Sequence, residues 1–182
     1  MIKVSDKGLE DAQKRLYGCK YGAERAVKDA LYRAGTGLKT DAVSETKKRY
    51  HLSAARIREA LLFKKGGGGA GLHSVTLTAR GGRKPITDYK VTGRGEAIQA
   101  AVKTDGMKTL KSGFLADKDG KKVVLWRPQG HAGPVRAVMS PAVPQAVKNK
   151  DTAAAVEKGA RERFAKRLDD NINRMLKGSW KG

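Results

Sequence analysis

The sequence predicts an α+β fold, with long helices towards both ends and an antiparallel sheet of about four or five strands between them. Residues towards both ends place apolar side chains at helical spacing, whereas short segments in the middle alternate apolar and polar residues. Glycine is plentiful, at 22 residues, and many of the glycines cluster in the middle, where they favour turns. We expect a single domain over residues 1–182, comprising a helical arm (1–50), a basic sheet region (51–127), an extended proline-containing segment (128–150) and a C-terminal helix (151–178).

The helical arm begins with a short strand at residues 2–4 and a short helix at about 9–17. Residues 21–50 then read as one long helix or two nearly continuous ones, with an apolar stripe at Ala23, Ala26, Val27, Ala30, Leu31, Ala34 and Leu38. Gly35 and Gly37 weaken this helix, since each interior glycine costs about 1 kcal/mol relative to alanine. We expect a kink or a close approach of another segment there rather than a break.

The sheet region opens with Ser53 as the N-cap of a helix over 54–60, followed by a strand from 61. Gly66–Gly71 is expected to form a flexible loop tip, and 74–79 alternates as a half-buried strand. Another short strand is expected at Pro85-Ile86 and Tyr89–Val91, and 97–102 is ambiguous between helix and strand. Residues 114–116 and 123–126 indicate a hairpin that turns at Asp119-Gly120.

The C-terminal region contains four of the five prolines between residues 128 and 144, which favours an extended segment. Asp151 or Thr152 is expected to cap the last helix. We predict that Phe164, Leu168 and Ile172 form the packing face of this helix. Part of that face could meet a neighbouring subunit, with packing onto the chain's own sheet as the equally simple alternative.

The net charge of +21 is the strongest clue to function, and it is unevenly distributed. Residues 1–45 hold 9 basic and 7 acidic residues, residues 46–127 hold 19 and 6, and residues 128–182 hold 11 and 5. Such a field attracts phosphate polymers and acidic protein surfaces. The simpler alternative is a solvated face that only keeps the protein soluble.

The residues with catalytic potential show no recognisable catalytic pattern. Cys19 is the single cysteine and reads as a packing thiol, and His51, His73 and His131 are far apart. Asp117 and Asp119 flank a turn, which explains them without a metal. We therefore expect no enzyme activity, no metal and no cofactor, and a nuclease with converging carboxylates stays a minor alternative.

A basic cluster is the candidate binding site. Its predicted members are Arg80, Arg83, Lys84 and Arg94, which surround glycine-rich turns and would face DNA or an acidic partner. The nearby aromatic residues Tyr89, Phe114 and Trp126 are spaced as strand residues and are expected in the core rather than as platforms for bases. Any nucleic-acid binding should therefore be independent of sequence.

The order of several short segments resembles that of the phage minor tail protein Z family, over nearly the whole chain. The segments are Ile2-Lys3-Val4 with Lys7–Lys14, Tyr50-x-x-Ser53-x-x-x-Ile57-Arg58, Ser140-Pro141-x-Val143-Pro144-Gln145, Glu162-x-Phe164-x-x-Arg167-Leu168 and Ile172–Leu176. The glycine-rich loop at Gly66–Gly71 and the spacing around Arg80–Gly95 depart from the family pattern.

The resemblance implies a virion structural protein at the head-proximal end of a phage tail, which completes the tail and helps to join it to the head connector. The implied assembly is a homo-oligomer, expected as a hexameric ring around the DNA channel. The implied partners are the tail terminator or tail tube protein, the head connector and neck proteins, and genomic DNA in the channel. The expected location is the virion, after the host cytoplasm, without membrane contact, since the sequence shows no signal peptide or membrane helix. The alternative is a free, sequence-independent nucleic-acid-binding protein.

Overall fold

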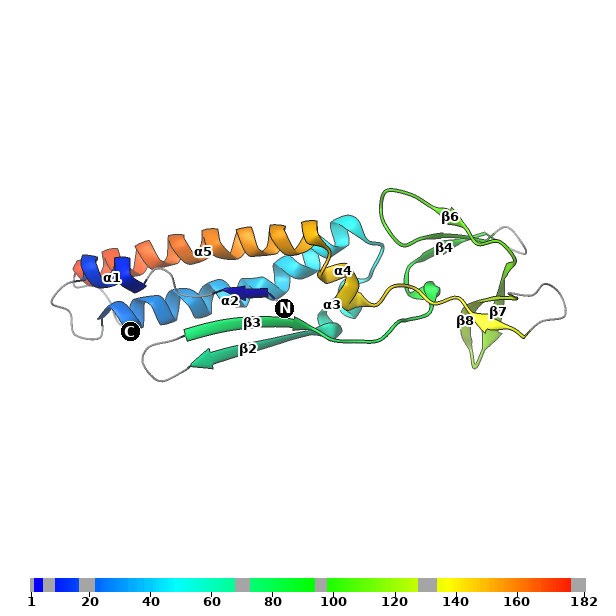
Figure 1. Ribbon diagram of the computed structural model, residues 1–182, viewed down its shortest axis with the longest axis horizontal. Helices are drawn as coiled ribbons and strands as arrows, with labels where there is room; N and C mark the ends of the chain where they lie inside the picture. Colours follow the sequence, from blue (N-terminus) through cyan, green and yellow to red (C-terminus); the bar gives the residue numbers. More distant parts are fainter. Residues whose placement is uncertain are drawn as a thin grey trace. The chain divides into compact units, whose positions relative to one another are not determined.

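The computed structural model describes residues 2–4, 9–16, 22–67, 73–93, 98–127 and 134–177 (Figure 1). The chain divides into two compact units. The first unit comprises Met1–Ala42, Leu61–Ala79 and Ala153–Gly182, and the second comprises Val43–Ala60 and Arg80–Thr152. The expectation of a single domain stays a prediction, because compactness does not report whether a unit folds alone.

The first unit combines the long helices with one antiparallel sheet of strand order β1-β3-β2. Its elements are β1 (Ile2–Val4), α1 (Leu9–Arg15), α2 (Gly22–Arg49) as far as Ala42, β2 (Leu61–Gly67), β3 (His73–Ala79) and α5 (Lys150–Leu176) from Ala153. In the central strand, Leu77 pairs with Ile2 on one side and with Phe63 on the other. The α+β class is therefore confirmed, with long helices towards both ends of the chain.

Helix α2 is continuous, and its predicted apolar stripe is buried throughout. The two glycines at its centre allow close packing instead of breaking it. A Cβ atom at Gly35 would lie 2.6 Å from Cγ1 of Val75 on β3, and one at Gly37 would clash with Nη1 of Arg163 on α5. The expected close approach is thus present, because β3 packs against α2 at Gly35 and α5 packs against it at Gly37.

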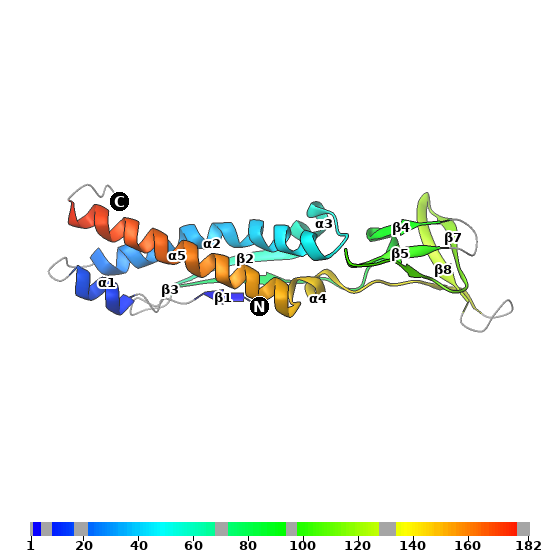
Figure 2. The same cartoon turned by 90° about the horizontal axis from the view of Figure 1, so that it is seen from above.

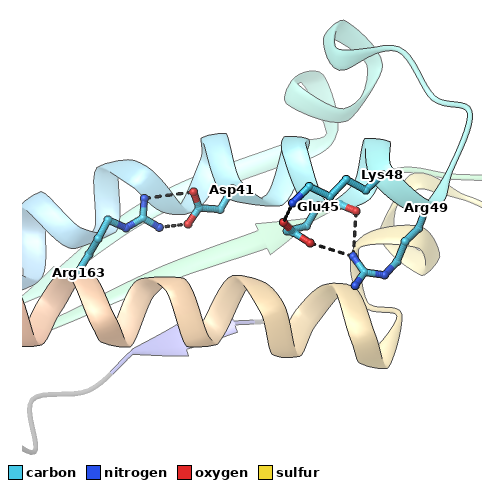
Figure 3. Close-up of polar contacts among 5 residues, drawn as sticks. All are labelled: Asp41, Glu45, Lys48, Arg49 and Arg163. Carbon is cyan, nitrogen blue, oxygen red and sulfur yellow. Dashed lines mark hydrogen bonds and ion pairs between the residues drawn. The ribbon is translucent and has the colours of Figure 1, made fainter.

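Helix α5 runs antiparallel beside α2 (Figure 1 and Figure 2). The Nδ2 atom of Asn171 donates to the carbonyl oxygen of Ala26 at 3.0 Å. Further along the pair, Arg163 donates from Nη1 to Oδ1 of Asp41 at 3.1 Å, and its Nη2 contacts Oδ2 of the same carboxylate (Figure 3). The apolar stripe of α5 is buried within this unit. The chain therefore packs this face of α5 into its own interior.

Strand β2 continues through Gly67, beyond the expected start of the glycine loop. Gly66 pairs with Ser74 and Gly67 pairs with His73, because ladder pairing needs only the backbone. The expectation of a loop from Gly66 was therefore wrong for these two residues. Residues 68–71 of the predicted loop tip lie outside the described residues.

The second unit contains two further antiparallel sheets, of strand orders β4-β5-β6 and β7-β8-β9. Its strands are β4 (Lys90–Thr92), β5 (Gln99–Ala101), β6 (Lys108–Thr109), β7 (Gly113–Lys118), β8 (Lys121–Trp126) and β9 (Arg136–Ala137). Ala100 of the first sheet and Val124 of the second lie in one buried cluster with Ile86 and Ile98. The expected single sheet of four or five strands is therefore corrected to three small sheets, because among the described residues no hydrogen-bonded ladder joins the strands of one sheet to those of another.

The predicted hairpin is confirmed, with Lys118 paired to Lys121 next to the turn. Asp119 (φ 54°) and Gly120 (φ 71°) both have positive φ, as a two-residue hairpin turn of this kind requires. Within the ambiguous segment near 97–102, Gln99–Ala101 form β5, and Ala97 lies outside the described residues. Between Pro85 and β4 the chain forms a short 3-10 helix, η2 (Ile86–Asp88), instead of a longer strand.

Short helices complete the second unit, which also contains the end of α2 from Val43 and the start of α5. The Oγ atom of Ser53 accepts from the amide of Arg56 at 3.3 Å at the start of α3 (Ala54–Ala60), as predicted. Helix α4 (Val143–Val147) lies where an extended segment was expected. Pro144 is tolerated there because first-turn amides lack intrahelical partners, and Oε1 of Gln145 accepts from the amide of Ala142 at 3.0 Å.

The cap of α5 also differs from the prediction. Asn149, rather than Asp151 or Thr152, supplies the capping oxygen, because its Oδ1 accepts from the amide of Asp151 at 3.1 Å. Thr152 is fully buried instead.

Candidate functional site

The basic segment Arg80–Lys84 is a coil whose backbone forms hydrogen bonds to other segments at both ends. At one end the amide of Arg80 donates to the carbonyl oxygen of Ala60 at 2.8 Å. At the other, the amide and Oγ of Ser140 both donate to the carbonyl oxygen of Lys84, at 2.8 and 2.9 Å. Gly81 lies between these anchors with a φ of 148°, a backbone conformation that residues other than glycine rarely adopt. The segment therefore presents its cations from a fixed backbone.

Tyr89 supports the second anchor. Its hydroxyl donates to the carbonyl oxygen of Pro141 at 3.1 Å, next to Ser140. Burial raises the pKa of Tyr89 to about 12, so the phenol stays protonated and remains a donor at neutral pH. As predicted, this aromatic side chain belongs to the interior, where it is 6% exposed.

Two hollows flank the basic segment. The first, the paired cleft, has a volume of about 120 Å³ and is lined by Arg56, Glu59, Ala60, Arg80, Gly81, Gly82, Lys84, Asp88 and Val143. Within it, Nη1 of Arg56 lies 3.7 Å from Oε2 of Glu59 and Nη2 lies 3.6 Å from Oδ1 of Asp88. Two carboxylates thus offset much of the positive charge in this cleft.

The second hollow, the Trp126 groove, is open and larger, with a volume of about 630 Å³. It is lined by Arg83, Thr109, Leu110, Lys111, Trp126, Arg136, Ala137, Val138 and Met139. No carboxylate is among these lining residues. Arg83, Lys111 and Arg136 are all exposed and, within the described part of the chain, none of them forms an ion pair.

The predicted basic cluster is thus divided by the structure. Arg80 and Lys84 line the paired cleft, whereas Arg83 lines the Trp126 groove. Arg94 lies outside the described residues. The three described residues belong to one segment, but Arg80 and Lys84 face a hollow that contains carboxylates and Arg83 faces one that does not.

Sequence reasoning missed the aromatic member of the groove. Trp126 is 37% exposed, so the expectation that it belongs to the core was wrong. The alternation along β8 places Trp126 on the same face as the buried Val124, but the indole lies past the end of the core that this face covers. Arg136 was missed because it lies in a segment of the chain read only as extended. Neither Trp126 nor Arg136 lies in a sequence pattern that marks it as part of a groove.

The predicted packing face of α5 lies in the first unit. Phe164, Leu168 and Ile172 are 9%, 6% and 0% exposed. They contribute to the interior of that unit and take no part in the basic surfaces of the second.

The described residues supply little acid–base or metal chemistry. His73 is buried with Nε2 3.4 Å from Oε1 of Glu24, in the first unit. Over the described ranges, no group of three His, Cys, Asp or Glu side chains is placed to hold a metal ion. Among the helices described here, none is long and apolar enough to cross a membrane.

Comparison of the chain with protein-family models, with curated proteins and with solved structures gave no match. The resemblance drawn from the order of sequence segments therefore stays an expectation.

Proposed function

We propose that this protein is a virion structural component that completes the head-proximal end of a phage tail and helps to join it to the head connector. The observation that carries the proposal is the Trp126 groove, where exposed cations without carboxylate partners surround an exposed aromatic side chain. Such a surface is typical of an interface that is completed by another molecule. The sequence resemblance supplies the identity of the assembly.

The proposed mechanism is assembly rather than catalysis. The first unit supplies a packed scaffold of long helices, and the second supplies basic surfaces that dock onto a partner or onto DNA in the channel. A homo-oligomeric ring, with the tail terminator or tail tube protein on one side and the head connector and neck proteins on the other, is part of the same proposal. So is its location in the virion.

The decisive experiment is electron microscopy of particles from a phage in which this gene is deleted, with the wild-type gene supplied on a plasmid as the control. We expect filled heads beside tails that are separate or unproductive, and recovery of infectious particles on complementation. Normal infectious particles without the gene would overturn the proposal.

The second candidate is a free protein that binds nucleic acid without sequence preference. The exposed indole of Trp126 beside Arg83, Lys111 and Arg136 favours it, because stacking on an aromatic residue combined with phosphate contacts is common in such proteins. Fluorescence anisotropy of the isolated protein with single-stranded and with duplex DNA tests it, because only unpaired bases can stack on the indole. A dedicated binder should show log affinity that falls steeply with log salt concentration, whereas a ring component need not bind before assembly.

A further inference from the structure

The Trp126 groove is an open continuation of the core face of the β7-β8-β9 sheet. Trp126 pairs with Arg136 across β8 and β9, so both side chains leave the sheet on the same face. Val124, two residues earlier on β8, points to that face as well and is 1% exposed. The apolar face therefore passes from the buried cluster at Val124 to the solvent-exposed indole of Trp126 within one strand.

Apart from Thr109 and this indole, the uncharged side chains that line the groove, called its floor here, are apolar and not aromatic. Leu110, Ala137, Val138 and Met139 contribute to it, and Met139 is 46% exposed. Methionine beside an exposed aromatic residue is typical of surfaces that receive side chains of a partner, because its unbranched thioether adapts to their shape. An apolar side chain of a partner would cover both residues.

The cations around this floor come from three separate parts of the chain. Arg83 follows β3, Lys111 follows β6 and Arg136 lies on β9. Because the lining contains no carboxylate, their charge is not neutralised within the groove, in contrast to Arg56 in the paired cleft. Two of the three are arginines, whose planar guanidinium groups match carboxylates in a bidentate geometry.

The composition of the groove favours a peptide over a nucleic acid as the occupant. Single-stranded nucleic acids are usually held by several aromatic side chains on which successive bases stack, and this groove has one. The remaining floor is aliphatic, which suits aliphatic side chains better than bases. An apolar floor with a charged rim is also the usual anatomy of a protein–protein interface.

We propose that the Trp126 groove docks an acidic peptide segment of a neighbouring protein in the assembly. Carboxylates of that segment pair with Arg83, Lys111 and Arg136, and one apolar side chain between them covers Trp126 and Met139. This inference rests on the proposed function only for the identity of the neighbour as a component of the virion. The chemistry of recognition follows from the groove alone.

The test is selection of peptides from a random 12-residue display library on the full-length protein. We expect the selected peptides to carry several Asp or Glu residues around one Leu, Met or aromatic residue. Synthetic copies of the selected peptides, labelled with fluorescein, then give dissociation constants by fluorescence polarisation. Affinity should fall as salt concentration rises, because exposed charge pairs are screened.

The matched variants separate the groove from the general positive charge of the protein. R83S/K111S/R136S removes the rim cations, and K118S/K121S/K122S removes the same charge from the tip of the β7–β8 hairpin, whose residues are exposed and do not line the groove. We expect about a tenfold or larger loss of peptide affinity in the first variant, about 1.4 kcal/mol, and less than about twofold in the second. Met139→Ser, an exposed position, should weaken binding without affecting folding.

Three results would overturn the inference. The selected peptides could lack acidic residues, they could bind the groove variant as tightly as the wild type, or a 12-nucleotide oligo(dT) could bind the groove when the peptides do not. Thermal melts of each variant establish that binding is compared between folded proteins. If deletion of the gene leaves infectious particles while the peptide result holds, the docking site stands and only the proposed identity of the assembly fails.

Discussion

The two compact units each comprise half of the chain and both carry excess positive charge, yet they place their cations differently. The first unit contains 19 Lys and Arg against 10 Asp and Glu, and the second contains 20 against 8. In the first, Arg163 reaches across from α5 to Asp41 and Arg15 reaches Asp169 at 2.6 Å. In the second, the rim of the Trp126 groove has no such partners in its lining.

This difference shows that net charge alone does not identify a working surface. A cation that forms an ion pair between two helices contributes to their packing. Cations that surround an exposed aromatic residue and have no carboxylate beside them are available to bind a partner. The comparison can be tested by changes that should affect stability in the first unit and leave it nearly unchanged at the groove.

The largest expected effect is on the packing face of α5. Ile172→Asp places a carboxylate at a fully buried position, so we expect a loss of about 4 kcal/mol or more, which leaves the chain unfolded or insoluble. Ala165→Asp introduces the same side chain at an exposed position of the same helix and should cost less than about 1 kcal/mol. Urea denaturation followed by circular dichroism measures both. Equal stability of the two variants would contradict the burial of this face.

The next effect concerns the two glycines of α2. Gly35→Ala drives a methyl group into the stiff, β-branched Val75, so we expect a loss of about 1–3 kcal/mol. Gly37→Ala meets only the end of the flexible Arg163 side chain, which can move away at the cost of its pair with Asp41, while the helix gains about 1 kcal/mol of propensity. Thermal melts should therefore rank Gly35→Ala well below Gly37→Ala, and the reverse order would contradict the packing described here.

A smaller effect distinguishes the two hollows within the second unit. Arg56→Met leaves the carboxylate of Asp88, whose side chain is 16% exposed, without its neighbouring cation, and should cost about 0.5–1 kcal/mol. Arg83→Met makes the same chemical change at the groove and should alter the free energy of unfolding by less than about 0.5 kcal/mol. Chemical denaturation at low salt compares the two. A greater loss of stability in Arg83→Met than in Arg56→Met would mean that Arg83 stabilises the fold of the free protein instead of being available to bind a partner.

The smallest effect depends on pH. Hydrogen bonds from Lys48 and Arg49 lower the pKa of Glu45 (Figure 3). A carboxyl group with a lowered folded-state pKa stabilises the protein above its ordinary pKa of about 4.5 and loses that contribution as pH falls through the lowered value. Glu45→Gln should thus be less stable than wild type by about 0.5 kcal/mol at pH 7, with the gap closing in acid. A gap that is independent of pH would exclude these ion pairs as its cause.

Much of the fold could be predicted because local signals and tertiary packing agree. The apolar stripe that begins at Ala23 fits one helix, and Asp119-Gly120 allows the positive φ values of a hairpin turn. The sheet was predicted less well, since short strands do not encode which strand they pair with or how many sheets they form. Helix α4 was missed because Pro144 suits an extended chain and a first helical turn equally.

The candidate site was predictable only as a basic segment. The sequence places Arg80, Arg83 and Lys84 within five residues, and charge density alone marks them as candidates for contact with an anion. It does not place carboxylates beside them, because Glu59 and Asp88 reach the paired cleft from other segments.

By itself, the sequence determined the α+β class, the long helices and the concentration of positive charge, because helical periodicity, turn residues and charge are local properties of the chain. Only the tertiary structure decided that Arg80 and Lys84 lie near carboxylates while Arg83 joins Lys111 and Arg136 around Trp126. The exposure of that indole depends on where the core ends. That boundary is set by contacts among Val124, Ile98 and Ile86, which are distant in sequence and meet only in the folded protein.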